Sequence, residues 1–225
     1  MTTSGQQAAE TWSDPEFARS WIDRDNQGDL LDMPRRVSAA LVAQDRPGTR
    51  LVVDVASGPG GFLEVYLDEF PEARGVWSDA SPTMMDEAKQ RLARFGDRVE
   101  FVIADMTDNG WLPAGADVVT TSRASHHLDR NSLHAYYREA AGALAPGGWL
   151  VNLDHIGPTD AWDARLRGVR QRFVPKRSTK SSHHHDYPLC SLDDHLSGFV
   201  AAGIPDVEVA WRAFITVLLT GRKPD

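Results

Sequence analysis

A run of strand-forming residues that ends in a glycine turn most constrains what this chain can fold into. The run is LVVDVASGPGG, residues Leu51–Gly61. Gly58, Gly60 and Gly61 carry no Cβ, so the backbone there can turn sharply and approach a ligand closely. The segment that follows, FLEVYLDEF, has the apolar spacing of a helix. A strand, a glycine turn and a helix in this order predict a cradle for a nucleotide-containing cofactor beside the free N–H groups of a helix N-terminus.

Two further predicted strands also end at an acidic residue. The segment ARGVWSD ends at Asp79, and VEFVIAD ends at Asp105. Together with Asp54, they would place three carboxylates at the carboxyl edge of a parallel sheet, where open α/β folds bind ligands. Asp79 lies 19 residues beyond Gly60, which suits a carboxylate that accepts hydrogen bonds from both hydroxyls of a ribose. The alternative is that Asp79 is only the N-cap of the following helix.

The order and spacing of five motifs resemble the class I S-adenosylmethionine-dependent methyltransferases of the small-molecule type. The motifs are DVASGPGG, WSDASPTMMDEA, VIADM, ADVVTTSRASHHL and LAPGGWLVNLDH. The resemblance covers residues 48–155 closely and the C-terminal part more loosely. A nicotinamide-dependent oxidoreductase, the rival interpretation, would carry a third glycine near the position of Leu63 and would lack the Asp105 element.

The resemblance implies S-adenosyl-L-methionine as the cofactor, and it assigns a set of residues to cofactor binding. These are Asp54, Ala56, Ser57, Gly58, Gly60, Asp79, Ala80, Met84, Asp105, Met106 and Ser122. The turn would lie against the methionine part of the cofactor, with Asp54 organising the ammonium group. Asp79 would hold the ribose, and Asp105 and Met106 would contact the adenine. Ala56 departs from the family pattern, which usually has its first glycine at this position.

The alternation of strands and helices over residues 48–155 predicts a parallel sheet that is covered on both faces. Two strands near the C-terminus, VEVAWRA and ITVLLTGR, lie so close together that only a tight antiparallel return near residues 212–214 fits. We therefore expect an α/β fold. Its centre would be a Rossmann-like, seven-stranded, mostly parallel sheet with a C-terminal antiparallel hairpin and helices on both faces.

A chain of 225 residues suits one methyltransferase domain, so we expect residues 1–225 to form a single unit. Its parts would be an N-terminal helical lid (1–47), a cofactor-binding core (48–155), a substrate lid insertion (156–190) and a C-terminal helix with the hairpin (191–225).

Methyl transfer requires alignment of the acceptor and, for a hydroxyl or carbon acceptor, removal of a proton. His126 and His127, which follow the fourth predicted strand, are candidate bases. We assign His127 to the catalytic set, with His155 at the tip of the fifth strand and His184 and His185 in the run SHHHDYP. The alternatives are packing or cofactor positioning for the histidines near the strands and metal ligation for the run. Adjacent histidines cannot all point to one ion, so we predict no metal site.

Four residues are candidates for contact with the acceptor. Arg123 could pair with an anionic acceptor or form a surface ion pair. Asp154 could form an acid–base pair with His155 or cap the next helix. Tyr187 ends the histidine run, and Trp21 belongs to an aromatic stripe that could cover an apolar acceptor or anchor the N-terminal helix.

The net charge of −8 argues against binding of nucleic acid by bulk electrostatics, so we expect a small-molecule acceptor. Cys190 is the sole cysteine, which excludes an intramolecular disulfide and a zinc ribbon. The N-terminal residues lack the pattern of a secretory signal, and no apolar run is long enough to cross a bilayer. We therefore expect a cytoplasmic protein without a membrane partner. A homodimer formed through the N-terminal helices is compatible with the sequence.

Overall fold

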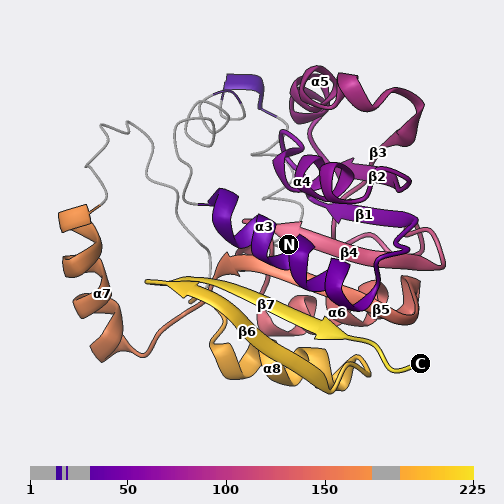
Figure 1. The fold of residues 1–225 in the computed structure, drawn as a ribbon. Coiled ribbons are helices and arrows are strands. Elements are labelled where there is room, and N and C mark those ends of the chain that lie inside the picture. Colours follow the sequence, from indigo (N-terminus) through magenta and orange to yellow (C-terminus); the bar gives the residue numbers. More distant parts are fainter. Residues whose placement is uncertain (1–13, 17–18, 20–30, 174–187) are drawn as a thin grey trace.

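The structure, a computed structural model, describes residues 14–16, 19, 31–173 and 188–225 (Figure 1). Its centre is a seven-stranded sheet with the strand order β3-β2-β1-β4-β5-β7-β6. The strands are β1 (Leu51–Val55), β2 (Arg74–Asp79), β3 (Val99–Ile103), β4 (Ala116–Ser122), β5 (Leu144–His155), β6 (Asp206–Ala213) and β7 (Thr216–Arg222). Strands β1 to β5 are parallel, whereas β7 runs antiparallel to both β5 and β6. The predicted α/β fold with a C-terminal hairpin is confirmed.

Helices cover both faces of the sheet, as predicted. The covering helices are α3 (Asp32–Asp45), α4 (Gly61–Glu69), α5 (Pro82–Arg91), α6 (Arg130–Ala143) and α8 (Leu192–Ala201), with the short 3-10 helices η2 (Ala93–Arg98) and η3 (Ser125–His127). Helix α7 (Asp160–Phe173) instead projects from the carboxyl edge of the sheet (Figure 1). Val52 and Val118 point to the face covered by α3, α4 and α5, and Val53 and Val119 point to the face covered by α6 and α8. Successive strand residues thus alternate between two apolar layers. Within the described ranges, no helix is long and apolar enough to cross a membrane.

One element boundary differs from the sequence-based expectation. Strand β3 ends at Ile103, so Asp105 lies in the loop beyond the strand. Strand β5 runs from Leu144 to His155, which lies at its tip as expected. The segment 156–190 contains α7, which ends at Phe173. At the C-terminal hairpin, the turn passes through Phe214, whose φ is 55°.

The turn between β1 and α4 uses the left-handed region of the backbone three times. Ala56 has a φ of 50°, Gly58 of 54° and Gly60 of 84°. A Cβ at Gly60 would also lie 2.9 Å from Cδ1 of Leu92. Glycine adopts these angles without strain, whereas the left-handed region costs an L-residue such as Ala56 about 1 kcal/mol or more. The departure from the family pattern at Ala56 is therefore a point of local strain.

Replacement of Ala56 by glycine should raise the free energy of unfolding by about 1 kcal/mol, because the strain at this position disappears. Urea denaturation of the variant and the wild type measures the difference. The matched substitution Gly60→Ala introduces strain and a contact with Leu92, and it should lower the free energy of unfolding by more than about 1 kcal/mol. An Ala56→Gly protein no more stable than the wild type would contradict this prediction.

Candidate active site

Asp54 lies beneath the glycine turn, fully buried within β1. Its carboxylate accepts hydrogen bonds from Oγ of Ser57 (2.5 Å), Oγ1 of Thr120 (2.8 Å) and the backbone N–H of Leu63 (3.2 Å). Burial raises the pKa of Asp54 to about 6, although the hydrogen bonds from Ser57 and Thr120 act in the opposite direction. Asp54 thus ties together the first strand, the turn, the following helix and β4. These hydrogen bonds hold the turn in place.

Asp79 closes β2 and faces the same turn. Its Oδ2 accepts the backbone N–H of Gly58 at 2.9 Å, and its Oδ1 accepts that of Ser81 at 2.9 Å. The N-cap of α5 is Ser81, whose Oγ accepts from the backbone N–H of Met84, so the alternative that Asp79 is this cap is wrong. Burial raises the pKa of Asp79 to about 6. Each carboxylate oxygen has a second lone pair, which can accept a hydrogen bond from a ligand hydroxyl.

The edge around this turn fits a cofactor that brings its own polar groups. Oγ of Ser122, at the end of β4, is buried and has no hydrogen-bond partner within the described part of the chain; the same holds for Oγ of Ser78 on β2. A buried hydroxyl without a partner is destabilising, and polar atoms of a bound ligand would satisfy it. The open turn, Asp79 and Ser122 therefore suit the amino-acid and ribose parts of S-adenosylmethionine.

The residues assigned to the adenine end differ from one another in burial and in their contacts. Asp105 accepts two hydrogen bonds at Oδ1, from the backbone N–H and the hydroxyl of Thr107, at 2.8 and 2.7 Å. Met106 is half-buried and packs against the apolar layer beneath α6 and α8. Ala80 is half-buried after β2. Met84 is 1% exposed and packs inside the core under α5, so it supports the site from within the core.

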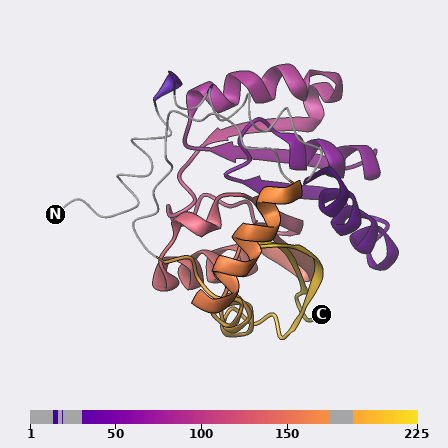
Figure 2. The ribbon, with the colours of Figure 1, turned by 90° about the vertical axis from the view of Figure 1, so that its left-hand side faces the viewer.

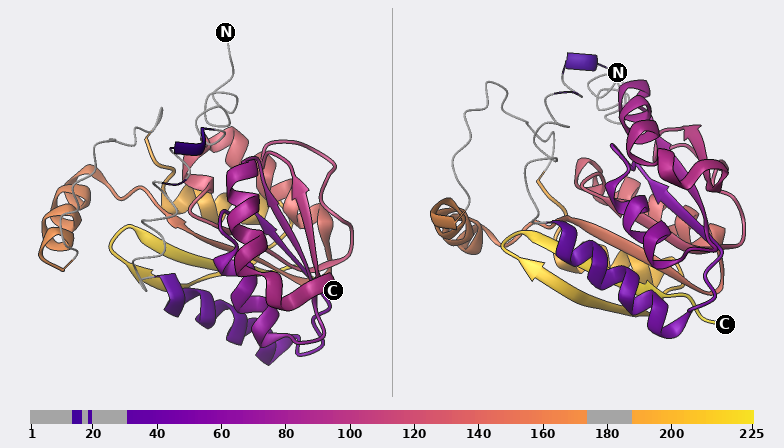
Figure 3. Two further views of the ribbon diagram at one scale, coloured as in Figure 1. Left: turned by 90° about the horizontal axis from the view of Figure 1, so that it is seen from above. Right: turned by 45° about the horizontal axis from the view of Figure 1, so that its top comes forward.

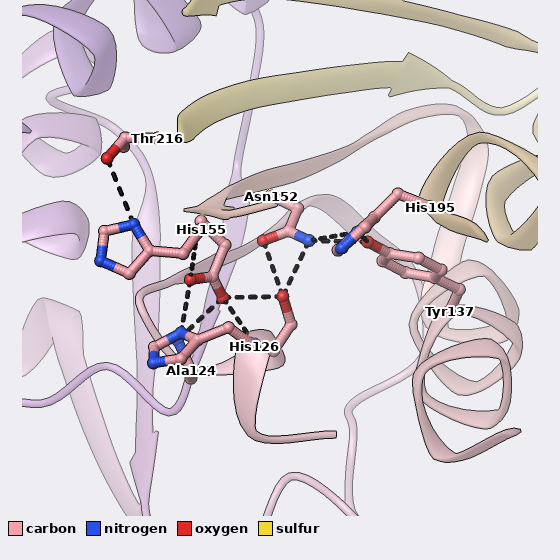
Figure 4. Close-up of polar contacts among 9 residues, drawn as sticks. Ala124, His126, Tyr137, Asn152, His155, His195 and Thr216 are labelled. Atoms are coloured by element: carbon pink, nitrogen blue, oxygen red, sulfur yellow. Dashed lines mark hydrogen bonds and ion pairs between the residues drawn. The ribbon is translucent and has the colours of Figure 1, made fainter. Parts of the chain in front are cut away.

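A second cluster of polar side chains follows β4 at the same edge of the sheet. Arg123 turns the chain with a φ of 59°, and its backbone N–H donates to the carbonyl of Leu153 at 3.0 Å. This turn leads η3 over the end of β5, where Asp154 is 1% exposed. Asp154 accepts five hydrogen bonds: from the N–H groups of Ala124, His126 and His155, from Oγ of Ser125 and from Nδ1 of His126 (Figure 4).

The His126–Asp154 pair is the central feature of this cluster. Nδ1 of His126 lies 2.6 Å from Oδ1 of Asp154, and His126 is only 8% exposed. Burial by itself would raise the pKa of Asp154, but the attraction and hydrogen bond of His126 outweigh it and hold this pKa well below its usual range. Asp154 therefore stays ionised. Because Nδ1–H of His126 is directed at the carboxylate, Nε2 is the nitrogen that can accept a proton from a ligand.

The structure pairs Asp154 with His126 and not with the side chain of His155. Successive residues of a strand point to opposite faces, so the side chains of His155 and Asp154 leave β5 in different directions. Nδ1 of His155 instead lies 3.3 Å from Oγ1 of Thr216 on β7. Burial, followed by the positive charges of Arg123 and His126, holds the pKa of His155 well below its usual range. The rings of His127 and His155 lie 4.1 and 5.3 Å from that of His126, centroid to centroid.

Behind this pair, a buried chain of hydrogen bonds leads to α6 and α8. The side-chain amide of Asn152 donates to Oγ of Ser125 (3.0 Å) and to the hydroxyl of Tyr137 (2.6 Å). Since Ser125 accepts from Asn152, its own proton is directed to Asp154 at 2.7 Å. The hydroxyl of Tyr137 is likewise directed to Nδ1 of His195 at 2.6 Å, and burial lowers the pKa of His195 to about 4. A neutral His195 therefore anchors the chain (Figure 4).

Replacement of Tyr137 by phenylalanine should lower the free energy of unfolding by about 2 kcal/mol, because Asn152 and His195 each lose a buried partner. The matched control is Tyr136→Phe on the same helix, since the hydroxyl of Tyr136 takes no part in this chain of bonds. Urea denaturation should show a clearly smaller effect for the control. Equal losses in the two variants would show that the hydrogen bonds of Tyr137 have no special weight.

Several predicted site residues are not brought into this picture. Trp21, His184, His185 and Tyr187 lie outside the described residues. Among residues that are described, no group of three or more histidine, cysteine or acidic side chains is arranged to hold a metal ion. Sequence reasoning preferred His127 over His126. The local sequence does not show which of the two adjacent histidines pairs with a carboxylate. Only the position of Asp154 in the structure shows it.

Comparison with known proteins adds three findings. Residues 52–148 match a family model described as a methyltransferase domain. Over 113 residues the chain is 36% identical to the 3-amino-4-hydroxybenzoate 4-O-methyltransferase of Streptomyces cremeus. This alignment covers 50% of this chain and 30% of that protein. Over 92 residues the chain is 36% identical to the ribosomal RNA small subunit methyltransferase H of Corynebacterium jeikeium, which covers 36% and 27%. The matches thus span less than a third of either relative.

In three dimensions, the chain resembles an O-methyltransferase family protein from Burkholderia thailandensis. The TM-score is 0.64 at 24% sequence identity, and the alignment covers 84% of this chain and 55% of that one. At this level of identity the likeness concerns the fold alone.

Proposed function

We propose that this chain, whose residues 52–148 match a methyltransferase domain model, is a class I S-adenosylmethionine-dependent methyltransferase. It would transfer a methyl group from S-adenosyl-L-methionine to a hydroxyl oxygen of a small-molecule acceptor. The observation that carries the choice of oxygen is the His126–Asp154 pair, 2.6 Å apart at the carboxyl edge of the sheet. A hydroxyl acceptor requires removal of a proton, whereas an unprotonated amine or a carboxylate requires none. A buried histidine–carboxylate pair would have little purpose in the second case.

The cofactor would lie over the turn at residues 56–60, with Asp79 on the ribose and Ser122 near the amino-acid end. When bound, it supplies a methyl group already activated on a sulfonium, so the chain needs only to align the acceptor and to manage one proton. Asp54 supports the turn through Ser57 and Leu63. Residues 1–225 would form one methyltransferase domain.

Within the site, His126 would act as the general base. Nε2 would accept the hydroxyl proton of the acceptor as the oxygen attacks, and the ionised Asp154 would stabilise the imidazolium that results. Ser125 and Asn152 hold the carboxylate in this orientation from behind. His155, with its lowered pKa, is the weaker base, and we assign it to packing beside His126. Arg123 remains a candidate for pairing with an anionic group of the acceptor.

The small-molecule part of the proposal rests on charge. The chain carries a net charge of −8, which opposes association with a polyanion such as RNA. The names of the two sequence relatives indicate different acceptors, a hydroxybenzoate for one and ribosomal RNA for the other. A structured RNA therefore belongs in the panel of acceptors that tests the proposal.

The experiment is an acceptor screen with S-adenosylmethionine that carries a labelled methyl group. Hydroxybenzoates, other phenols, hydroxy acids, amines and a small-subunit ribosomal RNA are incubated with the protein, and mass spectrometry follows the label. The proposal expects the demethylated cofactor and a labelled oxygen in one of the small acceptors. Label in the RNA, or on nitrogen only, would contradict it. Tight cofactor binding without any transfer would favour a cofactor-binding protein with different chemistry.

A further inference from the structure

Helix α7 stands apart from the rest of the described chain. It follows β5 and projects from the carboxyl edge of the sheet (Figures 1 and 3), and Figure 2, which looks onto that edge, shows it in front of the body. Among those of its side chains that the structure describes, none is buried. Trp162 is 57% exposed and Val169 is 45% exposed. A helix of 14 residues without packing is marginal in water, so a partner surface is expected.

The apolar side chains of α7 form one stripe. Trp162, Leu166 and Val169 are separated by four and then three positions, the spacing that aligns side chains along one side of a helix and forms the seam of paired helices. The guanidinium of Arg165 lies 5.4 Å from the ring centroid of Trp162 and so flanks this stripe. The stripe can therefore receive a second helix along its length.

The charges of α7 indicate which helix that is. Its first turn carries Asp160 and Asp163, and its last turn carries Arg170 and Arg172. Asp163 and Arg170 flank the stripe on the same side of the helix, so a second copy of α7 in the antiparallel orientation would bring Asp163 of each helix beside Arg170 of the other. An isologous interface around a twofold axis has this property, because the same surface must complement itself.

We propose that α7 is a dimerisation helix that pairs with α7 of a second copy in the antiparallel orientation. The twofold axis passes near Leu166, and Trp162 packs on Val169 of the partner subunit. Asp163 faces Arg170 of the partner subunit. This surface differs from the N-terminal helices, through which the sequence suggested a dimer, and it does not depend on the proposed methyl transfer.

A membrane surface is the competing partner, because basic amphipathic helices with an exposed tryptophan also bind lipid. Two features disfavour it here. Beside its four arginines, α7 carries Asp160 and Asp163, so two carboxylates would be brought to an anionic surface. The chain as a whole carries a net charge of −8, which adds repulsion from such a surface.

A charge exchange tests the pairing. One variant carries Asp160→Arg and Asp163→Arg, and the other carries Arg170→Asp and Arg172→Asp. Each variant places like charges at both ends of an antiparallel pair, whereas a mixture of the two restores opposite charges at both ends. Sedimentation velocity over a range of concentrations measures the mass, and circular dichroism checks that each variant is folded. None of the side chains of α7 that the structure describes is buried, so the fold should tolerate the reversed charges.

The wild-type chain should sediment at about twice 24.8 kDa at high concentration, each variant alone as a monomer, and the equimolar mixture again as a dimer. The dimer of a Trp162→Ala chain should dissociate at a higher protein concentration than the wild-type dimer. A wild-type chain that stays monomeric would overturn the proposal, and so would variants that still dimerise alone or a mixture that stays monomeric. If a monomeric wild-type chain floats with vesicles of anionic phospholipid, the membrane is the partner instead.

Discussion

A His126→Ala protein should lose methyl transfer to a hydroxyl acceptor by a factor of about 10² to 10⁴ in kcat, the usual contribution of a positioned general base. The physical reason is the geometry of the pair. Nδ1 of His126 is fixed by Asp154 at 2.6 Å, so Nε2 is the atom that takes the proton. Without this ring, the hydroxyl must lose its proton to water. The affinity for the cofactor should change little, because the turn that would hold it lies between β1 and α4.

The matched control is His134→Ala. His134 lies on α6, where its Nε2 lies 2.9 Å from the backbone carbonyl of Asp194, away from the His126–Asp154 pair. Its replacement should leave kcat within about twofold of the wild type. Asp154→Asn keeps the size of the side chain but removes the charge that stabilises the imidazolium, and it should lower kcat by about 100-fold. A His126→Ala protein with kcat close to the wild type would rule out the proposed base.

The second large effect is expected at Asp79. An Asp79→Asn protein should bind S-adenosylmethionine about 100-fold more weakly. Two hydrogen bonds from ribose hydroxyls to a carboxylate are together worth about 3 kcal/mol. The amide lacks one of the two acceptor oxygens and also the charge that strengthens the remaining hydrogen bond, so most of this free energy is lost. Calorimetric titration with the cofactor and with its demethylated product measures the change. Asp86→Asn, an exposed carboxylate on the neighbouring α5, is the control and should bind like the wild type.

Asp79 also holds the turn through Gly58 and Ser81, so the stability of the variant must be measured beside its affinity. A variant with an unchanged melting temperature and a 100-fold weaker affinity supports a direct contact with the cofactor. An unchanged affinity in a folded variant would refute the ribose assignment. A loss of stability that explains the whole loss of affinity would show that Asp79 acts only by holding the turn in place.

The affinity for the cofactor should also depend on pH. Burial raises the pKa values of Asp79 and Asp54 to about 6. The ionised carboxylates attract the cationic cofactor, and this attraction is complete above pH 7 and is lost as the pH falls through about 6. The association constant at pH 5 should therefore be about tenfold lower than at pH 7.5, since about one tenth of Asp79 is ionised at pH 5. Asp79→Asn should show a weaker dependence in the same titration.

The sequence by itself determined the elements that depend on neighbouring residues. Nearly continuous runs of buried, strand-forming residues define β1 and β4, and glycines at 58 and 60 occupy positions where φ is positive. The short connection between the last two strands required an antiparallel hairpin, which the structure confirms at Phe214. Propensity, turn chemistry and short loop lengths act over a few residues, so a sequence reveals them directly.

Only the tertiary structure decided which side chains meet. His126 and Asp154 are 28 positions apart, and they make contact because β4 and β5 pair in a particular register, with Ser122 opposite Leu153. The alternation of β5 then turns the carboxylate of Asp154 toward the backbone N–H of His126, whereas the ring of His155 lies beside the His126 ring and near Thr216. The link to His195 depends in turn on how α6 and α8 pack on the sheet. Such contacts arise from register and packing between distant segments, which no local pattern of residues encodes.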